Sequence, residues 1–236
     1  MFQNLSVYNV HSTLAAIDAN LVWLLVFGGA SLVFNFIYFG AAIHNGFRDK
    51  VVSMPIGATM LFLSHDLLYL LMFDKWFHGY QHWFPMLFWV GLIITLCMEC
   101  AFLHITIKFG RAEHAPQLTQ SQYRNLVLAA AVGVFIAWLP LKYVLADELW
   151  LFTFGWTVWF CTPFVIPMML RRNSSAGQSM LMWYSYIGMA VCYWTAMWPL
   201  DPFFRSPFWL GTGVLILVWA SAIIYTIKRL PNLPAE

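Results

Sequence analysis

The chain has 236 residues, of which 61% are hydrophobic, 19% aromatic and only 9% charged. Soluble domains carry about 25% charged residues, so this chain cannot cover a water-facing surface and a soluble globular domain is excluded. The formal net charge of +2 gives no indication of nucleic-acid binding. The composition predicts an integral, multi-pass membrane protein surrounded by the lipid bilayer.

Seven apolar segments follow one another along the chain. Each is long enough to cross a hydrocarbon core of roughly 30 Å, which takes about 20 helical residues. Short polar stretches such as "HNGFRDK" and "RRNSSAGQ" separate them. We therefore expect an all-α integral membrane protein, a seven-transmembrane-helix bundle that forms a single membrane domain over residues 1–236. The expected spans are 20–43, 52–73, 83–109, 125–145, 149–170, 179–199 and 207–229.

Lysine and arginine are distributed unevenly between the two ends of these spans, with nine of the twelve on one side. Basic residues accumulate on the cytoplasmic side of membrane proteins. The distribution therefore predicts an N-terminus outside, a cytoplasmic C-terminus and an odd number of spans. The nine are Arg48, Lys50, Lys108, Arg111, Arg124, Arg171, Arg172, Lys228 and Arg229, and the other three are Lys75, Lys142 and Arg205.

Two acidic residues lie inside the expected spans, Asp66 in the second and Glu99 in the third. A carboxylate in hydrocarbon costs on the order of several kcal/mol, and such residues usually mark a pathway or a reaction centre. Two carboxyl groups in one buried site can hold a single proton between them, as general acid–base catalysis requires. The expected depths of the two differ, so direct contact is not implied. Tyr69 lies at i+3 from Asp66, on the same helix face, and is placed to donate its hydroxyl.

Further polar and aromatic residues lie deep in the spans, and two interpretations of them stay open. The rings either pack in the core and in interfacial belts, or they line a cavity for a large apolar ligand that is transiently cationic. Asn35 and His65 are either hydrogen-bonded packing residues or part of such a cavity, although His65 points about 100° away from Asp66. The candidate substrate-binding residues are Asn35, His65, Trp89, Tyr184, Tyr186 and Trp194.

The sequence lacks the motifs of several metal- and cofactor-dependent classes. It contains no Gly-rich phosphate loop and no run of aspartates that would bind a diphosphate with magnesium. We therefore expect neither a metal nor a cofactor, and the sequence identifies no protein partner.

Several short motifs occur in an order that resembles a known family. The first span ends in "FNFIYFGAAIHNGFRDK", the second contains "HDLLY" and the third closes on "HITIKFG"; "RRNSSAGQS" precedes the sixth, and the last ends in "WASAIIYTIKRL". Over residues 30–229 the chain resembles the small seven-span membrane terpene cyclases of fungal and bacterial meroterpenoid and indole-terpenoid pathways. The resemblance implies that an epoxide or alkene of a polyprenylated substrate is protonated and the chain folded into rings. It also implies that Asp66, Tyr69, Glu99 and Asn35 occupy the family's polar positions.

The chain departs from the family pattern at three places. His65 stands where the family has tryptophan, and Asp66 replaces a glutamate, which shortens the side chain by one methylene. The family's second acid lies in the last span, whereas 207–229 contains none and has Leu217 at about that position. Asp201 precedes this span and reaches a cavity only from the outer loop.

These features together favour a membrane-embedded cyclase or isomerase for a lipophilic substrate of terpenoid or epoxy-prenylated type. Asp66 would be the proton donor, Tyr69 would orient it, and Glu99 would be the base or counter-ion. Two alternatives stay open. One is a proton-coupled transporter or channel for a small apolar compound, since buried carboxyls also serve proton relays. The other is a non-catalytic membrane assembly partner in which the two acids bond helices together.

Overall fold

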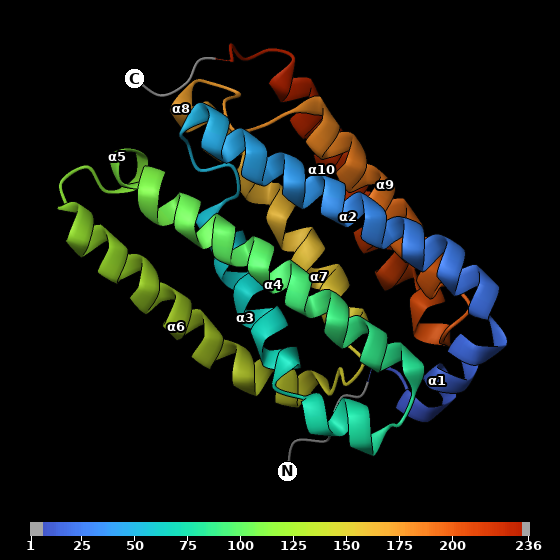
Figure 1. Ribbon diagram of the computed structural model, residues 1–236. Coiled ribbons are helices and arrows are strands. Elements are labelled where there is room, and N and C mark those ends of the chain that lie inside the picture. Colours follow the sequence, from blue (N-terminus) through green and yellow to red (C-terminus); the bar gives the residue numbers. More distant parts are fainter. Residues whose placement is uncertain (1–6, 233–236) are drawn as a thin grey trace.

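The computed structural model describes residues 7–232, and this part of the chain is built of helices and connecting loops without strands (Figure 1). A π-helical turn at Lys75–Gly79 and 3₁₀ turns at Thr162–Phe164 and Pro202–Arg205 join some of the helices. The α-helices are α1 (Val10–Ala19), α2 (Leu21–Asp49), α3 (Ile56–Leu70), α4 (Trp83–Phe109), α5 (Arg111–His114), α6 (Gln120–Leu145), α7 (Leu151–Cys161), α8 (Val165–Arg172), α9 (Met180–Met197) and α10 (Pro207–Ile227).

Helices occupy all seven segments in which spans were expected. Five of them are long and apolar enough to cross a membrane, namely α2, α4, α6, α10 and the combined α7–α8 segment. The chain is therefore an integral multi-pass membrane protein, as predicted. The segment expected at 52–73 contains the shorter α3, whose 15 residues follow Pro55 and cover about 22 Å. That all seven segments span the membrane, with the N-terminus outside and the C-terminus in the cytoplasm, stays a prediction.

The helix α7 lies at the centre of the bundle, behind α2 and α4 in Figure 1, and the α7–α8 segment continues from there to one end of the bundle. In the most apolar 18-residue stretch of this segment, 56% of the residues are buried. The corresponding stretches of the other four long helices are only 17–22% buried. The sequence of α7, LFTFGWTVWFC, is apolar on all sides, as is typical of a helix enclosed by others. Pro163 and Pro167 interrupt the segment with a 3₁₀ turn between α7 and α8.

Short polar side chains begin several of the helices by accepting hydrogen bonds from otherwise unpaired backbone N–H groups. Asn9 caps α1, Ser179 caps α9 and Ser206 caps α10. At the start of α6, Thr119 and Gln122 bond each other's backbone N–H groups in a capping box.

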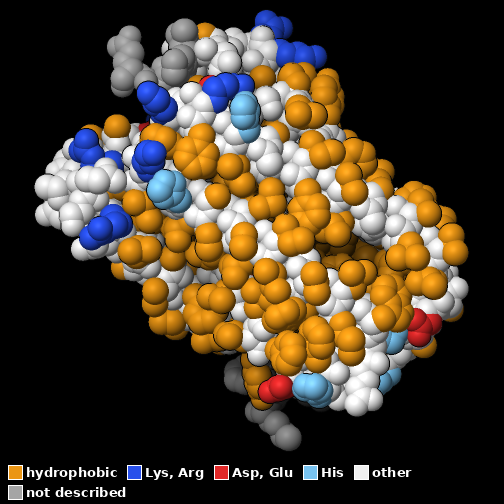
Figure 2. All heavy atoms as spheres, viewed as in Figure 1, with side chains coloured by type: hydrophobic (Ala, Val, Ile, Leu, Met, Phe, Trp, Pro, Cys, Tyr) orange, Lys and Arg blue, Asp and Glu red, His pale blue; other side chains and the backbone are white. Residues whose placement is uncertain are grey.

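Lys and Arg side chains gather at the end of the bundle where α5 and α8 lie (Figure 2). One of them, Arg172, joins three segments there. Its guanidinium donates to the carbonyl oxygens of Val52 at 2.9 Å and Ala176 at 2.6 Å, and to the carboxylate of Glu113 at 2.6 Å. Arg171 donates to the other oxygen of Glu113 at 2.7 Å. This ion pair ties α5 to the C-terminal end of α8.

The Glu113 ion pair predicts a pH-dependent contribution to stability. Burial by itself raises the pKa of Glu113, but the charge of Arg172 and the hydrogen bonds from both arginines outweigh burial and lower this pKa. The ionised pair therefore stabilises the fold above the ordinary glutamate pKa, and this contribution is lost as the pH falls through the lower pKa of the folded state. We expect Glu113→Gln to lower the free energy of unfolding by about 1–3 kcal/mol at neutral pH. Denaturant unfolding in detergent should show this difference shrinking in acid, and a difference that is independent of pH would contradict it.

Packing of the central helix predicts a second effect on stability. A Cβ atom added to Gly155 of α7 would lie 2.5 Å from the indole of Trp209 in α10, whereas one added to Gly133 of α6 would meet nothing within 4 Å. Gly155→Ala should destabilise the protein by about 1–3 kcal/mol through overpacking, and Gly133→Ala should not. Thermal unfolding of the two variants in detergent measures the difference, and equal midpoints would refute close packing of α7 on α10.

Candidate active site

Asp66 of α3 and Glu99 of α4 lie next to each other in the interior of the bundle. Their residues are 4% and 1% exposed, and both side chains line the same small cavity. The helices α3 and α4 pack against each other along this stretch. The structure thus brings together the two acids that the sequence analysis singled out.

The two carboxyl groups differ in their hydrogen-bond partners. For Asp66, Oδ2 accepts from the hydroxyl of Thr95 at 2.5 Å, and Oδ1 lies 2.9 Å from Nδ1 of His65. For Glu99, Oε2 is buried and receives no hydrogen bond. A buried carboxyl oxygen without a donor is costly, so Glu99 is the less satisfied member of the pair.

Tyr69 does not orient Asp66 through its hydroxyl. The hydroxyl donates to the backbone carbonyl of Asp147 at 2.5 Å and lies 3.2 Å from the hydroxyl of Thr153. Asp66 is held instead by Thr95 and by its sequence neighbour His65, which the helical angle alone had placed away from it.

Asp147 is a third buried acid near this site, and the sequence analysis did not select it. Its side chain accepts from the hydroxyl of Tyr8, and its Oδ2 accepts from both the backbone N–H and the hydroxyl of Thr153, each at 2.6 Å. The Thr153 hydroxyl in turn lies 2.8 Å from Nε2 of His65. The signal in the sequence was an acid directly before an apolar span, but the loop "ADE" has the composition of an ordinary connection.

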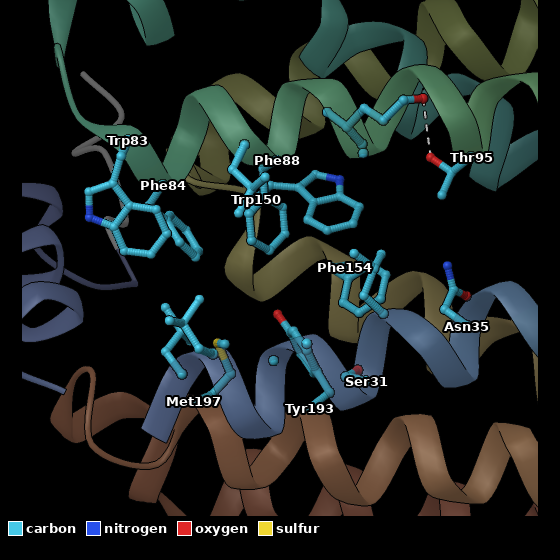
Figure 3. Close-up of a pocket in the computed structure, with 18 residues that line it drawn as sticks. Ser31, Asn35, Trp83, Phe84, Phe88, Thr95, Trp150, Phe154, Tyr193 and Met197 are labelled. Carbon is cyan, nitrogen blue, oxygen red and sulfur yellow. Dashed lines mark hydrogen bonds between the residues drawn. The ribbon is translucent and has the colours of Figure 1, made fainter. Parts of the chain in front are cut away.

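A large cavity lies between α2 and α4 and extends inward to α7 and α9 (Figure 3). Its enclosed volume is about 130 Å³. Like most ligand sites, it is lined mainly by apolar side chains with a few polar groups. Its polar side chains are few and include Ser31 and Asn35. Its aromatic wall consists of Trp83, Phe84, Phe88, Trp150, Phe154 and Tyr193.

The mouth of this cavity faces sideways rather than toward either end of the bundle. Leu25 and Leu32 of α2 and Leu87 of α4 line the cavity and are also 53%, 42% and 55% exposed. Figure 2 shows a hollow on this face, surrounded by hydrophobic side chains. In a membrane protein such a side opening faces the acyl chains of the bilayer.

A smaller cavity adjoins the large one and contains the carboxyl pair. Asp66 and Glu99 both line it. Four residues line both cavities and connect them: Asn35, Thr95, Trp150 and Phe154. The acids therefore lie at the polar inner end of an otherwise apolar chamber.

The remaining candidate substrate-binding residues are divided between this chamber and other places. Asn35 lines both cavities and Tyr186 lines the smaller one, where its hydroxyl donates to the carbonyl of Val158. Trp89 donates to the carbonyl of Leu70 and packs on Phe73 and Phe77, Tyr184 is 55% exposed on the outside, and Trp194 stacks on Trp209. None of these last three lines the two cavities.

The aromatic residues that do line the large cavity were not selected from the sequence. Trp83, Phe84 and Phe88 lie near the start of α4, at a depth typical of an interfacial belt. Depth in a span does not reveal which side of the helix faces a cavity. Within residues 7–232 no three His, Cys, Asp or Glu side chains lie close enough to hold a metal ion.

The fold and the cavities define a multi-pass membrane protein with an internal apolar chamber. The sequence matches the family model of Pyr4-like transmembrane terpene cyclases over residues 16–227. Because this match covers most of the chain, the chain belongs to that family, and the resemblance noted from its motifs is confirmed. No curated protein and no solved structure shows significant similarity to it.

Proposed function

We propose that the protein is a membrane-embedded cyclase that folds a lipophilic terpenoid chain into rings by acid–base chemistry. The observation that carries this proposal is the junction of the two cavities, where a carboxyl pair lies at the inner end of an aromatic chamber. Membership of the transmembrane terpene cyclases supports the same activity. The side opening between α2 and α4 suits a substrate that arrives from the bilayer.

In the proposed reaction Asp66 is the proton donor and Glu99 is the base. The Asp66 proton passes to the oxygen of a terminal epoxide, the carbon–oxygen bond breaks, and the neighbouring alkene supplies the electron pair for the first ring bond. The final carbocation loses a proton to the Glu99 carboxylate. The product is an isomer of the substrate, and the proton then returns from Glu99 to Asp66.

The walls of the chamber favour this chemistry in two ways. Aromatic faces stabilise a nearby desolvated cation by about 2 kcal/mol. Phe88, Trp150 and Phe154 line the large cavity, and the last two also line the small cavity that contains the carboxyl pair. A wall that is mostly apolar also keeps water away, and water would otherwise capture the cation before the rings close.

Removal of the donor proton tests the proposal directly. Asp66→Asn keeps an oxygen that can accept from Thr95, but it cannot supply a proton, so turnover should fall by about 100-fold or more. Membranes are incubated with an arene carrying an epoxidised farnesyl chain, and an isomeric product of unchanged mass is measured. The matched control is Asp201→Asn, because Asp201 lies outside both cavities and accepts from the backbone N–H of Phe203. Full turnover by a folded Asp66→Asn protein would refute the role of Asp66, and transport of an unchanged solute would favour the carrier alternative.

Partial filling of the chamber tests where the substrate binds. Gly91 lines the large cavity, and a Cβ atom added there would meet nothing within 4 Å. Gly91→Leu should therefore place its side chain in the cavity and raise KM by about tenfold or more. Gly133→Leu makes the same change at an equally open position on α6, away from both cavities, and should leave KM unchanged. Equal KM values for the two variants would place the substrate elsewhere.

A further inference from the structure

Two groups compete for one ring nitrogen of His65. Its Nδ1 lies 2.6 Å from the indole Nε1 of Trp150 and 2.9 Å from Oδ1 of Asp66. A histidine ring nitrogen has either one hydrogen or one lone pair, and an indole N–H can only donate. The hydrogen positions around His65 can therefore be worked out from the neighbours of its other nitrogen.

The other nitrogen, Nε2, lies 2.8 Å from the hydroxyl oxygen of Thr153. The single hydrogen of that hydroxyl is directed to Oδ2 of Asp147 at 2.6 Å, a carboxylate oxygen that also accepts from the backbone N–H of Thr153. The Thr153 oxygen thus accepts from His65, and Nε2 carries a hydrogen.

Nδ1 is then the acceptor for the indole of Trp150, and His65 is neutral. A charged imidazole would carry a hydrogen on Nδ1 as well, and that hydrogen would face the indole N–H across 2.6 Å with no lone pair between them. If Asp66 were ionised, a lone pair of its Oδ1 would face the lone pair of Nδ1 across 2.9 Å. A protonated Asp66 avoids this repulsion, because its hydrogen and that of the indole share the Nδ1 lone pair; the carboxyl group of Asp66 is therefore protonated.

The backbone at Trp150 is strained in the conformation that makes this contact. Its φ of +69° is in the left-handed region, which a bulky side chain rarely adopts and which persists only where the surroundings hold it. The ring packs on Phe154 at 4.3 Å, on Phe88 at 5.3 Å and on His65 at 5.2 Å between centroids. The same ring lines both cavities.

We propose that Trp150 is a positioning residue whose indole N–H keeps His65 neutral and thereby keeps the catalytic proton on Asp66. This inference rests on the proposed function, since it names the group that sets the state of the same acid. Without the indole N–H, the lone pair of Nδ1 is free to take the proton of Asp66. The carboxylate of Asp147, acting through Thr153, favours that transfer because it stabilises a charged imidazole. The titratable groups around this cluster are Asp66 and Tyr69 of α3, Glu99 of α4, Lys142 of α6, Tyr193 of α9, and Tyr8, Asp147 and Glu148.

A matched pair of tryptophans provides the test. Trp138 also packs against the ring of His65, at 5.7 Å, but its indole nitrogen has no hydrogen-bond partner and it lines neither cavity. Trp150→Phe and Trp138→Phe make the same change in two indoles that contact one imidazole. At neutral pH we expect kcat to fall about tenfold in Trp150→Phe, the equivalent of one hydrogen bond, and to stay unchanged in Trp138→Phe.

The pH profile separates this role from a structural one. In Trp150→Phe the shared proton is on His65, so the acid form of Asp66 requires a second proton, and activity on the epoxyfarnesyl arene should recover as the pH is lowered. The wild-type protein already has the proton on Asp66 and should gain nothing. Loss of activity without recovery in acid, or wild-type kcat at neutral pH, would overturn the proposal.

Infrared absorption tests the same point without any substrate. The carbonyl band of a protonated carboxyl group should be present in the wild-type protein and in Trp138→Phe at neutral pH. It should be weaker than in the wild-type protein in both Asp66→Asn and Trp150→Phe. A band of wild-type intensity in Trp150→Phe would refute the inference even if the cyclase activity is real. If instead Asp66→Asn turned over the arene normally, the proposed function would fail while the band still decides where the proton lies.

Discussion

Two carboxyl groups lie side by side in a medium that solvates neither of them, and the interior of the bundle is arranged around that constraint. Transfer of an isolated charge into hydrocarbon is very unfavourable, so the protein itself must supply the hydrogen bonds that water would give. Thr95 and His65 do this for Asp66. The residues behind them, Thr153 and Asp147, are buried and bonded in turn. The central helix α7 is thus linked to α3 by polar bonds as well as by packing.

These polar side chains bond to one another rather than project into the neighbouring chamber, which is almost entirely apolar. Its walls are aromatic rings and aliphatic side chains from α2, α4, α7 and α9. Such walls neither attack a carbocation nor deliver water to it, whereas their π faces attract positive charge. The proposed cyclisation requires a proton transfer and several ring closures. The small polar end of the chamber suits the proton transfer, and the large aromatic end suits the ring closures.

The helices could be predicted from the sequence because a span is specified by length and hydropathy, and α4 begins and ends where it was expected. Asp66 and Glu99 could be identified because acids are rare in spans. The side-chain contacts could not be predicted. His65 reaches Asp66 although adjacent helical positions point apart, and Trp150 reaches His65 only because a loop residue adopts a left-handed backbone conformation. Asp147 lies in a loop that folds inward, and composition cannot distinguish such a loop from one that lies on the surface.

The carboxyl pair also bears on the acid that the last helix lacks. Cyclisation of an epoxide is an isomerisation, so the enzyme must take back one proton for each proton that it gives. A donor and an acceptor on separate helices need a route between them for this return. Asp66 and Glu99 line the same small cavity, so in the proposed reaction the proton passes from one to the other without crossing the chamber. Leu217, at about the position where the family resemblance implied an acid, packs against the hydrophobic core in α10. In the proposed reaction α3 supplies the proton donor and α4 supplies the base. The enzyme therefore recovers the proton that it gives without an acid at the position of Leu217.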